Sequence, residues 1–192
     1  MNTKNITLSG VLFAVGLILH QLVPAFGGIS FDVQLSMLFI VILINNSFKG
    51  AVAAGIVSGI ITALTTKFPG GQIPNVIDKV VTAIVIYGVI VLLTKAFNAI
   101  KNSTDSKSGK IYTLINNSAN IYVLVGLAAA IGTLISGTIF LYSALYIVGF
   151  PSGMSVGIGF LTIVLPTTIG NIIITPLLYK LVKRVCRNYV LA

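Results

Sequence analysis

The segment Thr65-Thr66-Lys67-Phe68-Pro69-Gly70-Gly71-Gln72-Ile73-Pro74-Asn75-Val76-Ile77-Asp78-Lys79 decides how this chain folds. It lies between two long apolar runs and contains two prolines and two glycines, which end helices and form tight turns. An Asp-Lys pair follows a few residues inside the next apolar run. Because charged side chains are costly within apolar segments, we expect the chemistry of the protein to lie here.

The composition indicates an integral membrane protein. Hydrophobic residues make up 56% of the chain, charged residues make up 8%, and the mean hydropathy is +1.06. These values lie outside the range of soluble globular domains. A length of 192 residues accommodates about six membrane-spanning helices of roughly 20 residues each. We therefore predict an all-α integral membrane protein with six transmembrane helices, formed as a single transmembrane domain over residues 1–192.

Six apolar runs mark the predicted helices, at residues 6–24, 33–47, 50–66, 75–97, 120–148 and 155–180. The first run follows one charge, Lys4, and lacks a small-residue cleavage site, so we expect a retained helix rather than a signal peptide. The second run is too short to cross a hydrocarbon core about 30 Å thick. Either its helix extends backwards through Asp32, or residues 25–31 fill the missing depth as irregular backbone. Both alternatives place Asp32 near a polar pocket.

The basic residues predict the orientation. A net charge of +9 would suggest nucleic acid as a partner of a soluble protein, but topology explains it better here, and we expect no nucleic-acid partner. With cytoplasmic N and C termini, only Lys67 and Lys79 face outward. Ten basic residues then face inward: Lys4, Lys49, Lys95, Lys101, Lys107, Lys110, Lys180, Lys183, Arg184 and Arg187. This asymmetry is typical of membrane proteins in that orientation.

The three connections on the predicted outer side share turn chemistry. They are Phe26-Gly27-Gly28, Phe68-Pro69-Gly70-Gly71 and Phe150-Pro151-Ser152-Gly153. One interpretation is that glycine and proline are simply common in turns. The other is that phenyl rings from three loops converge into an apolar slot for a flat ligand.

Small residues at four-residue spacing predict close contact between helix backbones. The strips are Ala51, Gly55 and Gly59, then Ala54, Ser58 and Thr62, and in the fifth run Ala128, Gly132 and Ser136. Packing inside the bundle explains these strips. For Gly10 and Ala14, near the cytoplasmic end of the first run, docking of a partner subunit is an open alternative.

Asp78 and Lys79 are the leading candidates for ligand binding, because ionisable residues at membrane depth are usually functional. Pro74 suits the first turn of the following helix, whose free N–H groups would attract a ligand carboxylate with help from Lys79. Asp78 or Asp32 would face a ligand ammonium. The alternative is that Asp78 only complements the helix N-terminus and that Lys79 snorkels to the lipid headgroups.

Amides and one histidine extend this candidate site. Gln72 and Asn75 add hydrogen-bonding groups beside the start of the same helix. Asn171, in the sixth run, must pair either with backbone freed by Pro166 or with a ligand. His20 is either a satisfied packing residue or a proton site near neutral pH.

Several kinds of chemistry are excluded by what the sequence lacks. It has only three carboxylates, no glutamate, no His-Glu-x-x-His pattern and no phosphate-binding Gly-x-x-x-x-Gly-Lys-Ser/Thr loop. Cys186 is the only cysteine, so a disulfide framework is absent. We therefore expect that the protein is not an enzyme and that it has no catalytic residues, no metal site and no cofactor. A binding or transport subunit without its own motor fits these features.

With these residues in view, the chain resembles the small six-helix tryptophan transporters of the TrpP type. These are similar to substrate-binding S components of energy-coupling factor (ECF) transporters. The resemblance covers most of the chain and rests on Gly27-Gly28 with Asp32 and on residues 63–79, 134–140 with 147–153, and 164–171. It implies bacterial tryptophan uptake by a multi-pass protein of the cell membrane, with the substrate held on the outer side.

The resemblance also implies partners. S components dock on a shared transmembrane T subunit, partly through an Ala-x-x-x-Ala motif in the first helix, and two ATPase subunits supply the energy. Here the matching position reads Gly10-Val-Leu-Phe-Ala14. Close packing is compatible with glycine in place of the first alanine.

Tryptophan matches the candidate groups. The start of the fourth helix with Lys79 would bind its carboxylate, and Asp78 or Asp32 its ammonium. The indole ring would stack on Phe31, Phe68 or Phe150, with its N–H donated to Asn75 or Asn171. Alternatives are a solitary carrier driven by protons or the membrane potential, and an S component for another small aromatic compound or vitamin. A membrane enzyme and a structural subunit without a ligand are the alternatives from other functional classes.

Overall fold

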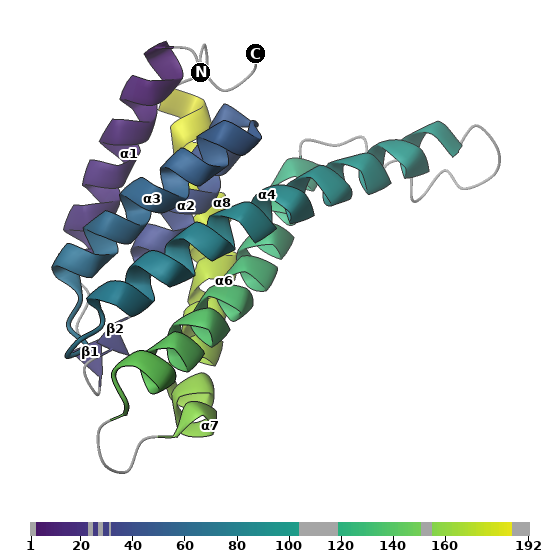
Figure 1. The fold of residues 1–192 in the computed structure, drawn as a ribbon. Coiled ribbons are helices and arrows are strands. Elements are labelled where there is room, and N and C mark those ends of the chain that lie inside the picture. The colour runs from purple at the N-terminus through teal and green to yellow at the C-terminus, as the bar shows by residue number, and fades with distance from the viewer. Residues whose placement is uncertain are drawn as a thin grey trace.

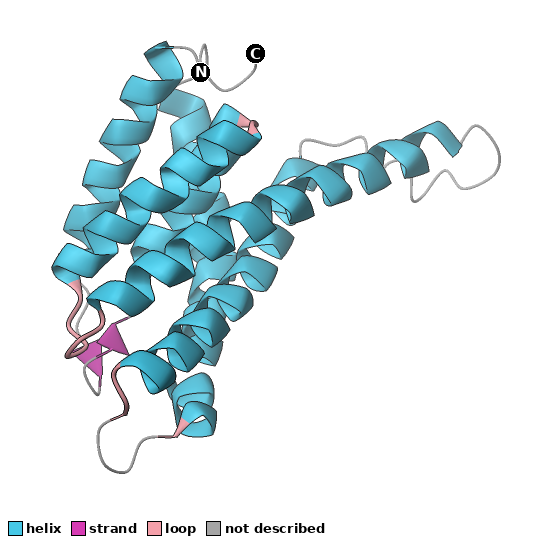
Figure 2. Ribbon diagram, in the orientation of Figure 1, coloured by secondary structure: helices cyan, strands magenta, loops and turns pink. Residues whose placement is uncertain are grey.

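The apolar runs of the sequence form six helical spans in the computed structural model, which describes residues 3–22, 25–26, 29–30, 32–103, 119–150 and 155–185 (Figures 1 and 2). The spans are α1 (Thr3–Leu22), α2 (Val33–Asn45), α3 (Phe48–Thr65), α4 (Gln72–Ser103), α6 (Ala119–Ile147), and a last span of α7 (Val156–Gly159), η1 (Phe160–Val164) and α8 (Leu165–Val185). Five of them are long and apolar enough to cross a membrane, and α2 is shorter. The predicted all-α class with six helices is confirmed.

The shortest of the six spans, α2, lies at the centre of the bundle. It contacts α1, α3, α4, α6 and α8, and every residue from 33 to 42 is buried. Because α2 is covered by protein, its 13 residues need not match the thickness of the lipid. The length deficit seen in the sequence therefore reflects a central position.

Asp32 does not continue this helix, so the prediction of a backward extension is wrong. Its Oδ1 accepts a hydrogen bond from the Leu35 N–H at 3.0 Å and caps the start of α2. Before it, β1 (Ala25–Phe26) pairs antiparallel with β2 (Ile29–Ser30). The predicted irregular backbone thus contains a short hairpin, while Gly27, Gly28 and Phe31 lie outside the described residues.

The segment with two prolines and two glycines, residues 65–79, turns the chain between α3 and α4. Gly70 has a φ of 73°, a left-handed conformation that favours glycine. A Cβ atom added there would lie 2.7 Å from the Val148 side chain. Glycine at this position therefore lets the α3–α4 connection pack on the end of α6.

Glycines of α3 and α6 allow close helix packing, as their spacing predicted. A Cβ atom on Gly55 would lie 2.7 Å from the Ala83 Cβ and 3.0 Å from the Lys79 carbonyl oxygen of α4. On Gly132 it would overlap the ring of Phe39 and lie 2.8 Å from the Ile86 Cδ1. The interpretation of these strips as internal packing is confirmed.

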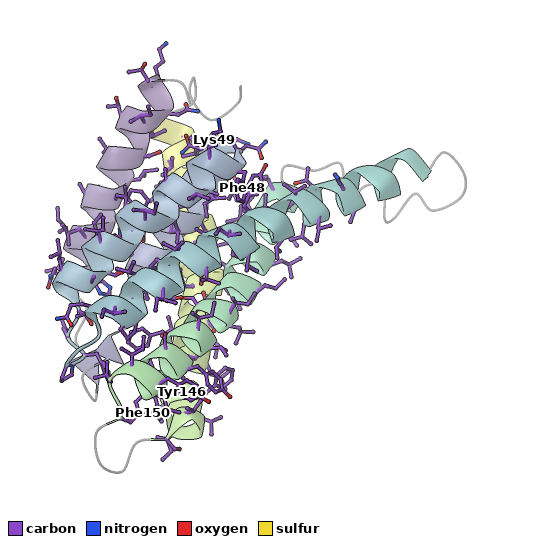
Figure 3. All side chains as sticks on the ribbon, viewed as in Figure 1. Phe48, Lys49, Tyr146 and Phe150 are labelled. Atoms are coloured by element: carbon purple, nitrogen blue, oxygen red, sulfur yellow. The ribbon has the colours of Figure 1, made fainter. Side chains whose placement is uncertain are left out.

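Both termini of the described chain lie at one end of the bundle (Figure 1). The hairpin, the α3–α4 connection and the α6–α7 connection lie at the other end, which we call the hairpin end. Figure 3 shows Lys49 near the end with the termini and Phe150 at the hairpin end. The assignment of the termini to the cytoplasm remains a prediction from charge.

Replacement of Gly55 by alanine tests the close packing of α3 on α4. The added methyl group has no room, so we expect a loss of about 1–3 kcal/mol in stability, measured by thermal unfolding of the purified chain. Gly88→Ala is the matched control, because a Cβ there meets no described atom within 4 Å. Equal unfolding temperatures for the two variants would contradict the packing.

Candidate functional site

A cavity at the hairpin end is lined by residues of all six spans. It encloses about 660 Å³ of space between atoms, a volume that includes open solvent at its mouth. The described lining residues are His20, Asp32, Leu35, Thr62, Thr66, Lys67, Phe68, Asn75, Asp78, Lys79, Thr133, Ser136, Gly137, Phe140, Leu141, Ile163, Val164 and Thr167. The cavity is thus the site where the predicted ligand-binding segment meets the other helices.

The ammonium group of Lys79 is held between two carboxylates. Its Nζ lies 2.6 Å from Oδ2 of Asp32 and forms an ion pair with Oδ2 of Asp78. Lys79 and Asp78 are each only 1% exposed. The snorkelling alternative for Lys79 is therefore wrong, because its charge is turned into the protein.

Asp78 is fully bound by the protein. In addition to the contact with Lys79, it accepts hydrogen bonds from Ser136 Oγ at 2.9 Å and from Thr82 Oγ1 at 3.0 Å. The alternative that Asp78 only complements a helix N-terminus is wrong. Asp78 instead connects α4 to α6 through buried polar contacts.

Asp32 is more open than Asp78. Its side chain is 20% exposed, against 1% for that of Asp78. His20 Nδ1 lies 4.0 Å from Oδ1 of Asp32 and has no hydrogen-bond partner within the described chain. The described protein therefore leaves Nδ1 of the buried His20 without a hydrogen bond, and both the packing role and the role as a proton site stay predictions.

Asn171 binds the main chain of Asp32. Its Nδ2 donates to the Asp32 carbonyl oxygen at 3.3 Å and to Thr133 Oγ1 at 3.1 Å, and Ser36 Oγ donates to its Oδ1 at 3.0 Å. The predicted pairing with backbone freed by Pro166 is not what the structure shows. Instead, this amide joins α8, α6 and the start of α2.

The turn at η1 shapes the wall next to this amide. η1 is a π-helical turn that ends just before Pro166, which has no N–H to donate to a helix. Leu165 N–H bonds to the Phe160 carbonyl, one residue beyond the usual helical partner. This wider turn contributes Ile163 and Val164 to the cavity wall.

Aromatic rings form the apolar part of the site. The ring of Phe68 packs edge to face on Phe140 at 5.8 Å and on Phe150 at 6.4 Å between centroids. Two of the predicted loop phenylalanines thus meet, and Phe140 of α6 joins them. The side chain of Phe26, and Phe31, Pro151, Ser152 and Gly153, lie outside what the structure describes.

The structure gathers most of the predicted ligand-binding residues. Asp32, Phe68, Asn75, Asp78 and Lys79 line the cavity. Phe150 supports Phe68, and Asn171 supports Asp32, although neither is among the lining residues. Gln72 is exposed and is not among the lining residues either. Contact of any of these side chains with a ligand stays a prediction.

Sequence reasoning missed two hydroxyl partners of Asp78, one partner of Asn171 and one aromatic ring. They are Thr82 and Ser136, Thr133, and Phe140. Ser136 was assigned to packing because it continues a strip of small residues. A signal was available in retrospect: Thr82 follows Asp78 by four residues, so both lie on one helix face.

Comparisons with known proteins cover nearly the whole chain. The family described as "Tryptophan transporter TrpP" matches residues 2–187. A "Probable tryptophan transport protein" of Clostridium perfringens is 40% identical over 97% of this chain and 95% of that protein. Proteins with the same description from Clostridium acetobutylicum and Bacillus subtilis are each 36% identical, over 97% and 98% of this chain and 96% and 95% of their own lengths. No solved structure matches the chain.

Removal of the Lys79 charge tests the buried ion pairs. Lys79→Met leaves two carboxylates without their shared cation, so we expect a loss of about 3–5 kcal/mol in stability, measured by thermal unfolding in detergent. Adding Asp78→Asn should restore part of this loss. Lys49→Met, an exposed lysine at the opposite end (Figure 3), is the control. An unchanged unfolding temperature for Lys79→Met would rule out the ion pairs.

Proposed function

Because the chain belongs to the TrpP family of tryptophan transporters, we propose that it binds tryptophan in the cavity at the hairpin end and imports it into the cytoplasm. It is a multi-pass protein of the bacterial cell membrane and a transporter rather than an enzyme. The observation that carries the proposal is one cavity in which paired charges lie close to phenyl rings.

The lining groups suit each part of tryptophan. The α-ammonium and α-carboxylate need groups of opposite charge, which Asp32, Asp78 and Lys79 supply. The indole ring needs an apolar surface, which Phe68 and Phe140 supply. Within the described chain, Asn171 is occupied by protein partners, so Asn75 is the better acceptor for the indole N–H.

The connections at the hairpin end would form the gate. The positive-inside rule assigns this end to the outside of the cell. The α3–α4 connection packs on the end of α6 through Gly70 and Val148, so a movement of one connection would displace the other. We therefore assign alternating access to these connections, which would open outward for binding and close before release.

An ECF-type motor is the energy source we favour. The sequence has no nucleotide-binding loop, and α1 presents Gly10 and Ala14 as an exposed, flat face for a partner. A T subunit and two ATPase subunits would then complete the transporter, with this chain as the S component. A solitary proton-driven carrier is the second candidate, and the position of His20 beside Asp32 favours it.

The binding proposal predicts that the purified chain binds tryptophan without a partner. The chain has no tryptophan of its own, so the fluorescence of bound indole reports occupancy directly. We expect saturable binding, poor competition by tyrosine, and an affinity about three- to tenfold weaker in Phe140→Leu because an aromatic contact is lost. Absence of saturable binding would defeat the proposal that this chain alone holds the site.

The choice of motor predicts different uptake behaviour in cells. For an ECF motor, we expect tryptophan uptake to stop when the ATPase subunits are deleted and to persist in His20→Gln. For a proton-driven carrier, dissipation of the proton gradient should stop uptake and His20→Gln should change its pH dependence. Uptake that survives loss of the ATPases would exclude the ECF proposal.

A further inference from the structure

The two carboxylates around Lys79 differ in how firmly the protein satisfies them. Asp78 accepts hydrogen bonds from Ser136 and Thr82 besides its ion pair, and it is 1% exposed. Asp32 Oδ2 has Lys79 Nζ as its partner, and the Asp32 side chain is 20% exposed toward the cavity it lines. The Asp32–Lys79 contact is therefore the ion pair that a ligand can reach.

Asp32 is held close to the main chain, whereas the buried ammonium of Lys79 is held at the end of a long side chain by Asp32, Asp78 and Ser136 Oγ, the last at 3.4 Å. The Asp32 side chain is held by the Leu35 N–H and its carbonyl by Asn171 Nδ2. Asn171 is itself held by Ser36 and Thr133. The ammonium of Lys79 sits at the end of a flexible four-carbon stem. If the Asp32–Lys79 ion pair separates, we expect the Lys79 side chain to move rather than Asp32. Lys79 then keeps its contact with Asp78.

With the exposed Lys67 included and His20 counted as neutral, the formal charges of the described lining residues sum to zero. The described lining residues include two carboxylates, Asp32 and Asp78, and two ammonium groups, Lys67 and Lys79. A ligand that is a simple anion or a simple cation would add a net charge to this set of groups, which is costly where the groups are buried. A zwitterion adds no net charge.

We propose that a zwitterionic ligand inserts into the Asp32–Lys79 ion pair. The ligand ammonium replaces Lys79 as the partner of Asp32 Oδ2, and the ligand carboxylate replaces Asp32 as the partner of Lys79 Nζ. Every charge keeps a partner of opposite sign, so the exchange avoids an unpaired buried charge. This inference rests on the proposed function and specifies its ligand class, which is an aromatic compound with a free α-ammonium and a free α-carboxylate.

Three indole compounds test the insertion on the unmodified chain. They are tryptophan, tryptamine, which lacks the carboxylate, and indole-3-propionate, which lacks the ammonium. All three fluoresce, and the chain contributes no tryptophan background. We expect tryptophan to bind about ten- to a hundredfold more tightly than either analogue, because each analogue leaves one charged group without its new partner.

Asp32→Asn separates this role from a structural one. Asparagine is as good a helix cap as aspartate, so the start of α2 is preserved while the charge is lost. We expect tryptophan binding to weaken about ten- to a hundredfold and indole-3-propionate binding to strengthen, since Lys79 loses a competing carboxylate. Asp105→Asn is the matched control, because Asp105 is the remaining acidic residue of the chain.

The outcomes distinguish the two proposals. Tryptophan binding with either analogue within about threefold would overturn the insertion and leave the transport proposal intact. An equal loss of all three ligands in Asp32→Asn would also overturn it, because that is the result of a general structural role. If the unmodified chain binds no tryptophan, the proposal that this chain alone holds the site falls, and the insertion falls with it. If Asp32→Asn does not fold, the comparison of the three ligands on the unmodified chain decides.

Discussion

The structure depends on one constraint, the burial of the Lys79 charge inside a membrane protein. An isolated ammonium at this depth would be very costly, so it must have partners of opposite charge. Asp78 comes from the same helix, and Asp32 comes from the chain that precedes α2. Ser136 then ties the cluster to α6, and Asn171 ties Asp32 to α8. Four spans are therefore joined around one cation.

The close packing of α3 on α4 serves the same site. Cβ atoms added to Gly55 and Gly59 would lie 3.0 Å from the Lys79 carbonyl oxygen and 3.5 Å from the Lys79 Cβ. The glycines thus allow α3 to cover the backbone of Lys79. The Lys79 side chain extends toward Asp32 and the cavity. The small residues of α3, which the sequence predicts to serve helix packing, thus also separate the charged cluster from lipid.

The sequence predicts the helices well and their contacts poorly. Long apolar runs and the Pro-Gly segment at residues 65–79 are local signals, and the spans and the turn follow from them. Asp78 and Lys79 are recognisable because charge is rare in such runs. The partners of Asn171 are not, because Ser36 lies 135 residues away and the Asp32 carbonyl 139. Tertiary packing decides which helix faces meet across such separations. It also decides that Gln72 is exposed rather than part of the cavity wall.

We propose that a zwitterion binds at the Asp32–Lys79 pair. The most direct measurement is an experimental structure of the chain with tryptophan bound. We expect the ligand ammonium on Asp32 Oδ2 and the ligand carboxylate on Lys79 Nζ, with Lys79 still in contact with Asp78. A ligand bound elsewhere, with Asp32 and Lys79 still paired as at 2.6 Å here, would contradict it.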